Sequence, residues 1–217
     1  FKWHDTKHID PAKVMTAEEL EAGKFFGRYT DVDGDGIPFR TYPGTHPSKG
    51  AYFTRGTSRN RMAGYSEKGV DYQDNMERLL KKFHTAATLV PGPLVKPAAQ
   101  KTKIGAIYFG STSAAMNEAL ETLEDKGHHI NAMRVRAFPF AQEVYDFIHA
   151  HEEICVVEQN RDAQLRSLLM IEGGIDPARL TSILHYDGTP ITARFLIDAI
   201  GKRLEARQAT RQITRKP

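Results

Sequence analysis

The sequence predicts an α/β protein: an open, mostly parallel β-sheet in the second half, preceded by a loop-rich, partly helical segment. Between residues 103 and 207, four short apolar runs bounded by turns alternate with four helical stretches, which is the pattern of βαβ units. The first 90 residues offer two helices and one long loop, too little regular structure to bury a two-layer core. We therefore expect that first segment to pack against another domain.

Two helices are expected in the first half. Thr16 and Glu19 have the spacing of a capping box and start a short helix that ends near residue 23 or 27. A longer amphipathic helix is expected over residues 70–90, because apolar residues fall on one stripe and charged residues mostly on the opposite side. The stripe comprises Val70, Met76, Leu79, Leu80, Phe83, Ala87 and Val90. Residues 51–54 are the one strand candidate of this half.

The second half alternates strands and helices. Strands are expected at residues 103–109, 130–135, 154–158 and 180–185. Helices are expected at residues 114–126, 141–151, 161–171 and 193–207. The Pro-Gly-Pro sequence at 91–93 closes the first half and opens a connecting stretch that runs to residue 102. We place the domains at residues 1–95 and 103–217, the second with a basic C-terminal tail, and the linker at 96–102.

Composition excludes several classes of protein. A net charge of +3 over 217 residues is no argument for nucleic-acid binding. No apolar run reaches about 18 residues, so no membrane span is expected. Cys155 is the only cysteine, so it forms no intrachain disulfide and cannot hold an iron–sulfur cluster, which takes about four cysteines. The lack of disulfides fits a reducing cytoplasm. Residues 1–5 form neither a signal peptide nor a Met start, which suggests an incomplete chain.

The most distinctive stretch is residues 28–58, RYTDVDGDGIPFRTYPGTHPSKGAYFTRGTS. Gly, Pro, Asp and Thr are frequent in it, which predicts a loop, because these residues adopt turn conformations or bond back to nearby amides. It also carries aromatic anchors that disordered segments lack: Tyr29, Phe39, Tyr42, Tyr52 and Phe53. A loop this long is usually functional when it is ordered. We therefore expect it to bind or dock something.

Three carboxylates in this loop have the DxDxDG spacing of a calcium site: Asp31, Asp33 and Asp35. Alternate carboxylates face one point, and the glycine that follows permits a sharp turn. Tyr42, however, stands where an EF-hand has its bidentate Glu. A bound Ca²⁺ or Mg²⁺ that fixes the loop is one interpretation. The other is a loop whose carboxylates bond backbone amides or pair with Arg28 and Arg40.

Residues 37–66 contain no Asp or Glu but several cationic side chains. Together with glycines that free backbone amides, these cations could cradle an anion or dock an acidic partner. The candidate residues are Arg40, His46, Lys49 and Arg55. The alternative is a basic surface that pairs with acidic groups elsewhere in an assembly.

The stretch GRYTDVDGDGIPFRTYPGTHPSKGAYFTRGTS resembles the α subunit of 2-oxoacid:ferredoxin oxidoreductases, most closely the 2-oxoglutarate type. The resemblance continues, more weakly, through the second half. In that family the phrase joins a thiamine-pyrimidine domain to a domain similar to the C-terminal domain of transketolase. The resemblance implies that this chain is the C-terminal portion of an α subunit. Residues 1–95 would be the tail of the pyrimidine-binding domain with a docking loop, and residues 103–217 the transketolase-C-like domain.

For the whole enzyme, the resemblance implies oxidative decarboxylation of a 2-oxoacid to an acyl-CoA, with thiamine diphosphate, Mg²⁺ and a [4Fe–4S] cluster. The implied partners are a β subunit, the missing N-terminal part of the α subunit, ferredoxin and coenzyme A, in an oligomer. The family's catalytic residues match nothing in this chain, so we name none and expect the chain alone to be inactive. Its expected roles are assembly through residues 103–207 and an active-site rim through residues 28–61. A 2-oxoacid carboxylate, a coenzyme phosphate and ferredoxin are the anions that the basic loop would meet.

Other features have ordinary explanations. The Gly-Asp-Gly at 34–36, with Asn60 downstream, mimics a thiamine-diphosphate metal motif, but a polar loop flanks it on both sides. Cys155 is expected in the core, and four histidines on the surface: His128, His129, His149 and His151. Two further function classes stay open: a non-catalytic interaction module with the same fold, and a calcium-stabilised small-ligand-binding α/β protein.

Overall fold

The computed structural model describes residues 9–56 and 58–214. It divides into two compact units, Phe1–Leu89 and Val90–Pro217, and each is considered by itself. The chain start at residues 1–5 and the end of the basic tail, residues 215–217, lie outside the described residues. Within the described part, no helix is both long enough and apolar enough to cross a bilayer.

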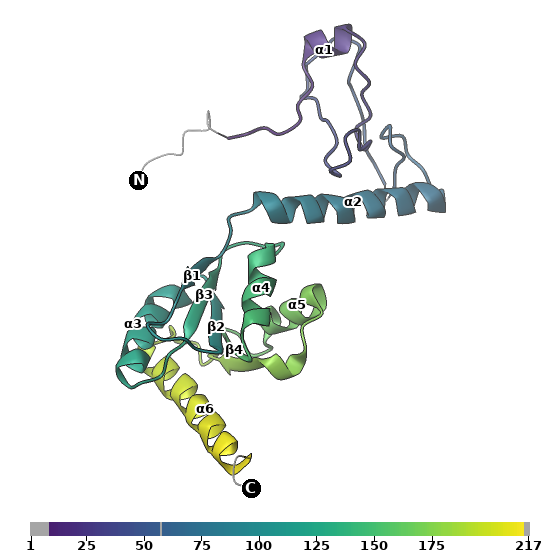
Figure 1. Cartoon of the computed structure of the whole chain (residues 1–217). Helices are drawn as coiled ribbons and strands as arrows, with labels where there is room; N and C mark the ends of the chain where they lie inside the picture. The colour runs from purple at the N-terminus through teal and green to yellow at the C-terminus, as the bar shows by residue number, and fades with distance from the viewer. Residues whose placement is uncertain (1–8, 57, 215–217) are drawn as a thin grey trace. The chain divides into compact units, whose positions relative to one another are not determined.

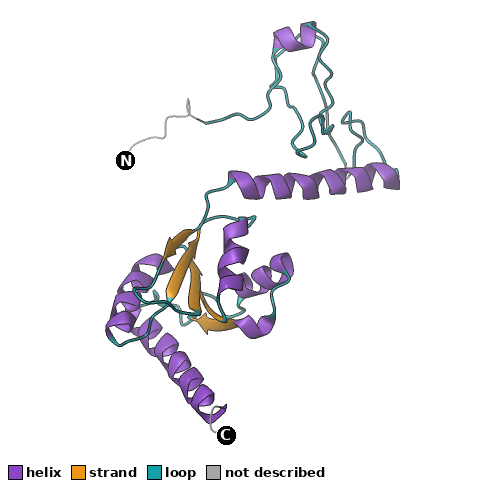
Figure 2. Cartoon of the chain, in the orientation of Figure 1, coloured by secondary structure: helices purple, strands orange, loops and turns teal. Residues whose placement is uncertain are grey.

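The second unit contains a five-stranded sheet in the order β1-β3-β2-β4-β5 (Figures 1 and 2). Strands β2 to β5 pair in parallel, whereas β1 pairs antiparallel with β3. The strands are β1 (Leu94–Lys96), β2 (Ile104–Phe109), β3 (Asn131–Val135), β4 (Glu153–Glu158) and β5 (Leu180–Leu184). The predicted fold class, an α/β protein with an open and mostly parallel sheet, is confirmed.

Helices cover both faces of this sheet. Helices α3 (Thr112–Asp125) and α6 (Ala193–Thr214) pack on one face, and α4 (Gln142–Ala150) and α5 (Gln164–Gly173) on the other (Figure 1). All six residues of β4 are buried, and their side chains alternate between the two cores. A parallel strand covered on both faces has this continuous apolar character, which is why ICVVE was recognisable in the sequence.

Three expectations about element boundaries need correction. Residues Leu94–Lys96 form an edge strand, although the sequence indicated a linker and a domain boundary here; three residues near prolines carry no alternation to detect. Helix α5 begins at Gln164 instead of residue 161, because the Asn160 side chain accepts hydrogen bonds from the amides of Asp162 and Gln164 and holds a turn first. The strand expected at residues 51–54 does not form.

The first unit consists of two helices and long connecting loops. Helix α1 (Ala17–Glu21) starts at the predicted capping box: Thr16 Oγ1 accepts from the Glu19 amide, and the Glu19 carboxylate accepts from the Thr16 amide. Helix α2 (Gly69–Leu89) matches the predicted long helix. The loops are tied by isolated bridges between Val14 and Arg40 and between Arg59 and Tyr65.

No residue of helix α2 is buried. Its apolar stripe is present, as expected, but it is open to solvent: Val70 is 71% exposed and Leu80 62%. Burial of an apolar face is what stabilises most helices in proteins. The first unit therefore does not itself cover the stripe that its longest helix offers.

Candidate functional site

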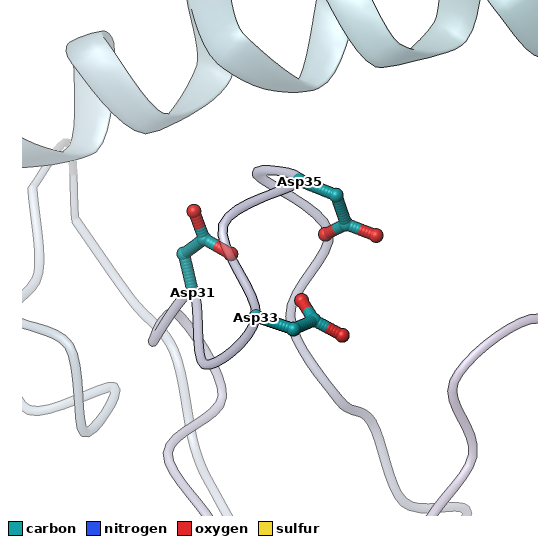
Figure 3. A group of neighbouring side chains, drawn as sticks. All are labelled: Asp31, Asp33 and Asp35. Atoms are coloured by element: carbon teal, nitrogen blue, oxygen red, sulfur yellow. The ribbon is translucent and has the colours of Figure 1, made fainter.

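The three predicted carboxylates do converge. One carboxylate oxygen from each of Asp31, Asp33 and Asp35 lies within 4.8 Å of the others (Figure 3). The loop turns on its own side chains, since Asp31 Oδ1 accepts from the Gly34 amide at 2.9 Å and Asp35 Oδ1 from the Ile37 amide at 2.7 Å. These Asx-type turns agree with one part of the alternative interpretation, in which the carboxylates accept hydrogen bonds from backbone amides.

Two lysines supply the positive charge at this cluster. Lys13 Nζ lies 2.6 Å from both Asp33 Oδ1 and Asp35 Oδ2, and Lys81 Nζ of helix α2 lies 3.1 Å from Asp31 Oδ2. The expected pairing of these carboxylates with Arg28 and Arg40 is wrong. Sequence reasoning missed Lys13 because nothing in its own surroundings marks it as a partner of a loop 20 residues away.

These ion pairs shift the pKa values of both sides. Partial burial opposes the charged forms, but hydrogen bonds and attraction to Asp33 and Asp35 raise the pKa of Lys13. Burial likewise opposes ionisation of Asp31 and Asp35, yet Lys81 and Lys13, together with backbone amides, hold the pKa values of both carboxyls low. The lysine ammonium thus occupies the role that a cation would have in a calcium loop.

Replacing Lys13 by methionine is expected to destabilise the first unit by about 1 kcal/mol, because the ion pairs are partly exposed and screened. Because the pKa of the Asp carboxyl is lowered on folding, it contributes stability at pH values above its unfolded-state pKa. Because the pKa of Lys13 is raised on folding, it contributes stability at pH values below its unfolded-state pKa. The loss on mutation should therefore be full between about pH 4 and pH 10 and fade outside that range.

Urea denaturation across pH measures this effect. Calcium should stabilise Lys13→Met more than the wild type, since the ammonium no longer competes for the carboxylates. Lys24→Met, which removes an exposed pair with Glu19 and a cation–π contact with Phe39, both outside the Asp31–Asp35 cluster, is the matched control. An equal response of all three proteins to calcium would contradict the assignment of Lys13.

Helix α2 approaches the Asp loop closely at Gly36. A Cβ on Gly36 would lie 2.4 Å from the Lys82 amide nitrogen and 2.9 Å from the Arg78 carbonyl oxygen. Hydrogen bonds secure the contact on either side: Arg78 Nη1 donates to the Gly36 carbonyl at 3.1 Å, and Thr85 Oγ1 donates to the Asp35 carbonyl at 2.6 Å. Gly36 therefore allows the backbone of helix α2 to lie close to the loop, in addition to allowing the turn.

The four predicted anion-docking residues do not form one cluster. His46 and Lys49 come together, but both contact the carboxylate of Glu21; Lys49 Nζ lies 2.9 Å from Glu21 Oε2. Arg40 donates to the Pro11 carbonyl at 2.5 Å and stacks on Tyr42, and Arg55 stacks on Tyr65.

A cavity lies beside the His46–Lys49 pair. Its volume is about 390 Å³, and residues 41–46 and 49–52 line it, including Tyr42 and Tyr52. Aromatic walls together with the Lys49 ammonium and the His46 ring could receive a small anionic group. Glu21 already neutralises part of that charge.

Sequence reasoning missed a second basic group in this unit. The guanidinium groups of Arg28, Arg59 and Arg78 all lie over the ring of Tyr29, at 5.2, 5.3 and 5.6 Å from its centroid. Arg78 comes from helix α2. No local pattern links it to Tyr29.

The Gly-Asp-Gly sequence does not form a diphosphate metal site in this chain. Asp35 is engaged by Lys13 and by the Ile37 amide. Asn60 closes a separate turn, in which its side-chain oxygen accepts from the amides of Met62 and Gly64. Neither residue follows a strand, so the described residues do not fit the thiamine-diphosphate motif.

The carboxyl edge of the sheet in the second unit is closed by its own hydrogen bonds. Gln159 Nε2 donates to Ser111 Oγ at 3.0 Å and to Thr112 Oγ1 at 3.2 Å. Glu158 is fully buried, and its carboxylate accepts from the amides of Leu165 and Arg166 at the start of helix α5. Open α/β sheets often bind ligands at this edge, but here the side chains at its centre are already hydrogen-bonded within the fold.

Cys155 and the histidines have structural surroundings. Burial raises the pKa of the Cys155 thiol to about 12, so it is the inert core residue that was predicted. His151 contradicts the expected surface position: it is 5% exposed, its Nδ1 bonds the Phe147 carbonyl, and its Nε2 bonds the Asn131 side chain. His128, His129 and His149 are at least partly exposed.

An apolar cavity of about 440 Å³ lies beside the ends of β2 and β3. Three phenylalanines, Phe109, Phe138 and Phe140, share its lining with residues of helix α5. Arg136 stands among them, and its Nε donates to the Gly92 carbonyl at 2.6 Å.

Comparisons with known proteins extend these observations. No protein-family profile matches the chain. It is 27% identical over 208 residues to 2-oxoacid:ferredoxin oxidoreductase 2, subunit alpha, of Aeropyrum pernix; the match covers 91% of this chain and 31% of that protein. It also superposes, with a TM-score of 0.71 and 19% identity, on a solved 2-oxoglutarate:ferredoxin oxidoreductase from Magnetococcus marinus with 2-oxoglutarate, coenzyme A and succinyl-CoA bound. That match covers 83% of this chain and 31% of the other, and it establishes likeness of fold.

The chain therefore spans about a third of the length of each relative. The resemblance drawn from residues 27–58 is confirmed and extends over both units. Over nine-tenths of its length, this chain is similar to part of the α subunit of a 2-oxoacid:ferredoxin oxidoreductase.

Proposed function

We propose that this chain is the C-terminal portion of the α subunit of a thiamine-diphosphate-dependent 2-oxoacid:ferredoxin oxidoreductase. The whole enzyme would convert a 2-oxoacid, of which 2-oxoglutarate is our candidate, to an acyl-CoA and pass electrons to ferredoxin in the cytoplasm. The observation that carries the proposal is a sequence match that runs through both units and leaves less than a tenth of the chain unmatched.

We place the redox chemistry and the coenzyme on other parts of the enzyme. The one cysteine of this chain is buried, with its thiol pKa raised to about 12, and a [4Fe–4S] cluster takes about four thiolates. The residues that imitate a diphosphate motif are engaged in local turns. A β subunit would therefore hold the cluster, Mg²⁺ and thiamine diphosphate.

We assign two roles to this chain: assembly of the oligomer and formation of the rim of the active site. The first unit, Phe1–Leu89, would be the tail of the pyrimidine-binding domain, and the second unit, Val90–Pro217, would be the transketolase-C-like domain that builds the oligomer, with strand β1 as part of its sheet. The exposed apolar stripe of helix α2 supports a further packing partner for the first unit. The N-terminal part of the α subunit is our candidate for that partner.

Residues 28–61 would form a rim that meets coenzyme A or ferredoxin. The aromatic cavity beside His46 and Lys49 supports this role, with Arg40 and Arg55 elsewhere on the same loops. Ca²⁺ or Mg²⁺ at Asp31, Asp33 and Asp35 would fix the rim only by displacing Lys13, which now bonds two of the carboxylates. This competition weighs against the calcium-stabilised alternative.

The proposal predicts that the isolated chain is inactive and that the complex containing it is active. The assay is reduction of a viologen dye that depends on both 2-oxoglutarate and coenzyme A, with thiamine diphosphate and Mg²⁺ present. Pyruvate in place of 2-oxoglutarate tests the substrate assignment. Turnover by the isolated chain would contradict the division of roles. A purified complex that shows no 2-oxoacid-dependent reduction would favour the non-catalytic interaction module.

A further inference from the structure

The arginine group around Tyr29 lies apart from the cavity beside His46 and Lys49 on which the rim role rests. Tyr29 and Arg28 lie in the long loop, Arg59 lies some thirty residues further on, and Arg78 comes from helix α2. Arg28 also lies over the ring of Tyr52, at 5.5 Å. Three cations from three segments are thus gathered on one aromatic side chain.

Carboxylates do not pair directly with the described arginines of this group, although Asp31 and Asp74 attract Arg78 at longer range. In the part of the chain that the structure describes, no carboxylate forms an ion pair with Arg28, Arg59 or Arg78. Nearby Arg61, by contrast, forms a two-pronged pair with Asp74, at 2.9 and 2.5 Å.

The hydrogen bonds that the three arginines do make reach neutral acceptors. Arg59 donates to the Tyr29 hydroxyl at 3.3 Å and the Gly56 carbonyl at 3.1 Å. Arg78 donates to the Gly36 carbonyl and to Asn75 Oδ1. The Nε atoms of Arg28, Arg59 and Arg78 are all buried without a hydrogen-bond partner. Each of these three guanidinium groups therefore has at least one N–H donor without an acceptor.

The local charge balance shows how large the surplus is. Tyr29 and Arg78 line a cavity of about 280 Å³, whose other lining residues are Asp31, Arg61, Asp74, Glu77 and Lys81. That lining carries three cations and three carboxylates and is neutral. Arg28 and Arg59 lie outside it and add two positive charges. Burial, followed by repulsion from Arg28, lowers the pKa of Arg78, and attraction to Tyr29, Asp31 and Asp74 opposes this shift only in part.

We propose that Arg28, Arg59 and Arg78 around Tyr29 form a binding site for a small doubly charged oxyanion, a phosphate group or a dicarboxylate. A guanidinium presents its N–H groups in a planar fork that matches both kinds of oxyanion, and its flat face can stack on an aromatic ring at the same time. Two surplus positive charges fit an anion of charge −2. The site differs from the predicted docking residues, none of which belongs to it, and it does not depend on the reaction proposed above.

Calorimetric titration of the full 217-residue chain tests the site. Inorganic phosphate and succinate are the two probes, at ionic strength kept constant with chloride. The wild type should bind at least one of them, and the one it prefers identifies the anion as a phosphate or a dicarboxylate. Arg59→Gln should weaken that binding at least ~10-fold, because a charge-assisted contact is lost. Arg161→Gln, which removes an exposed arginine of the second unit that pairs with Asp162, is the matched control and should bind as the wild type does.

Thermal unfolding separates binding from folding. In chloride, the unfolding temperature of Arg59→Gln should change little, because the relief of repulsion offsets the lost hydrogen bonds to Tyr29 and Gly56. The bound anion should raise the unfolding temperature of the wild type and of Arg161→Gln, but not that of Arg59→Gln. Failure of both anions to bind the wild type, or an equal response of all three proteins, would overturn the proposal.

Discussion

Replacing Gly36 by alanine is expected to destabilise the first unit by about 2–4 kcal/mol, because two costs coincide at this residue. Its φ of +77° is a left-handed conformation that a side chain disfavours. The added Cβ would also fall 2.4 Å from the Lys82 amide nitrogen, which is backbone and cannot rotate away. The Asp loop and helix α2 would have to separate.

Gly34→Ala is the matched control for this substitution. Gly34 has a φ of +86°, but the nearest atom to its Cβ is the flexible end of Lys81, at 3.7 Å. Only the conformational cost applies there, about 1 kcal/mol. Urea denaturation gives the total cost, and hydrogen exchange of the amides of helix α2 locates it. Equal losses in the two variants would mean that the close approach of helix and loop contributes nothing.

Replacing Glu158 by alanine is expected to cost the second unit about 3–5 kcal/mol, because several buried donors lose one acceptor together. Its carboxylate accepts from the Leu165 amide at 2.6 Å, the Arg166 amide at 3.0 Å and the Asn160 side chain at 2.9 Å. Glu158 therefore caps helix α5 from the end of a neighbouring strand, and alanine leaves that helix end unpaired.

Two further variants define the role of Glu158. Glu158→Gln keeps the shape and one acceptor oxygen, so its loss should be smaller than that of alanine. Glu118→Ala removes an exposed carboxylate on helix α3 and should change stability by less than about 0.5 kcal/mol. Urea denaturation with hydrogen exchange of the α5 amides measures all three. A Glu158→Ala protein as stable as Glu118→Ala would contradict the capping role.

The α/β architecture was predictable because β2 to β5 are buried strands whose apolar runs are bounded by turns. The edge strand β1 was not, because its three exposed residues pair through backbone atoms that carry no sequence pattern. The convergence of Asp31, Asp33 and Asp35 was also predictable, since alternate residues of a tight loop face one point.

The sequence could not predict contacts between residues that only the fold brings together. Lys13 lies 20 residues from the carboxylate it bonds, and Arg78 reaches Tyr29 from a separate helix. Helix α2 shows the opposite case. Its stripe was recognisable by periodicity, but periodicity cannot say which surface covers it, and no residue of the helix is buried.

The most direct test of the central claim is the mass and metal content of the assembly in which this chain is found in its native host. We predict a complex much heavier than the 24.4 kDa of this chain. It should include a second subunit and about four iron atoms per cluster. Its dye reduction should require a 2-oxoacid and coenzyme A. A monomer of 24.4 kDa that carries no iron and associates with no second subunit would contradict the claim.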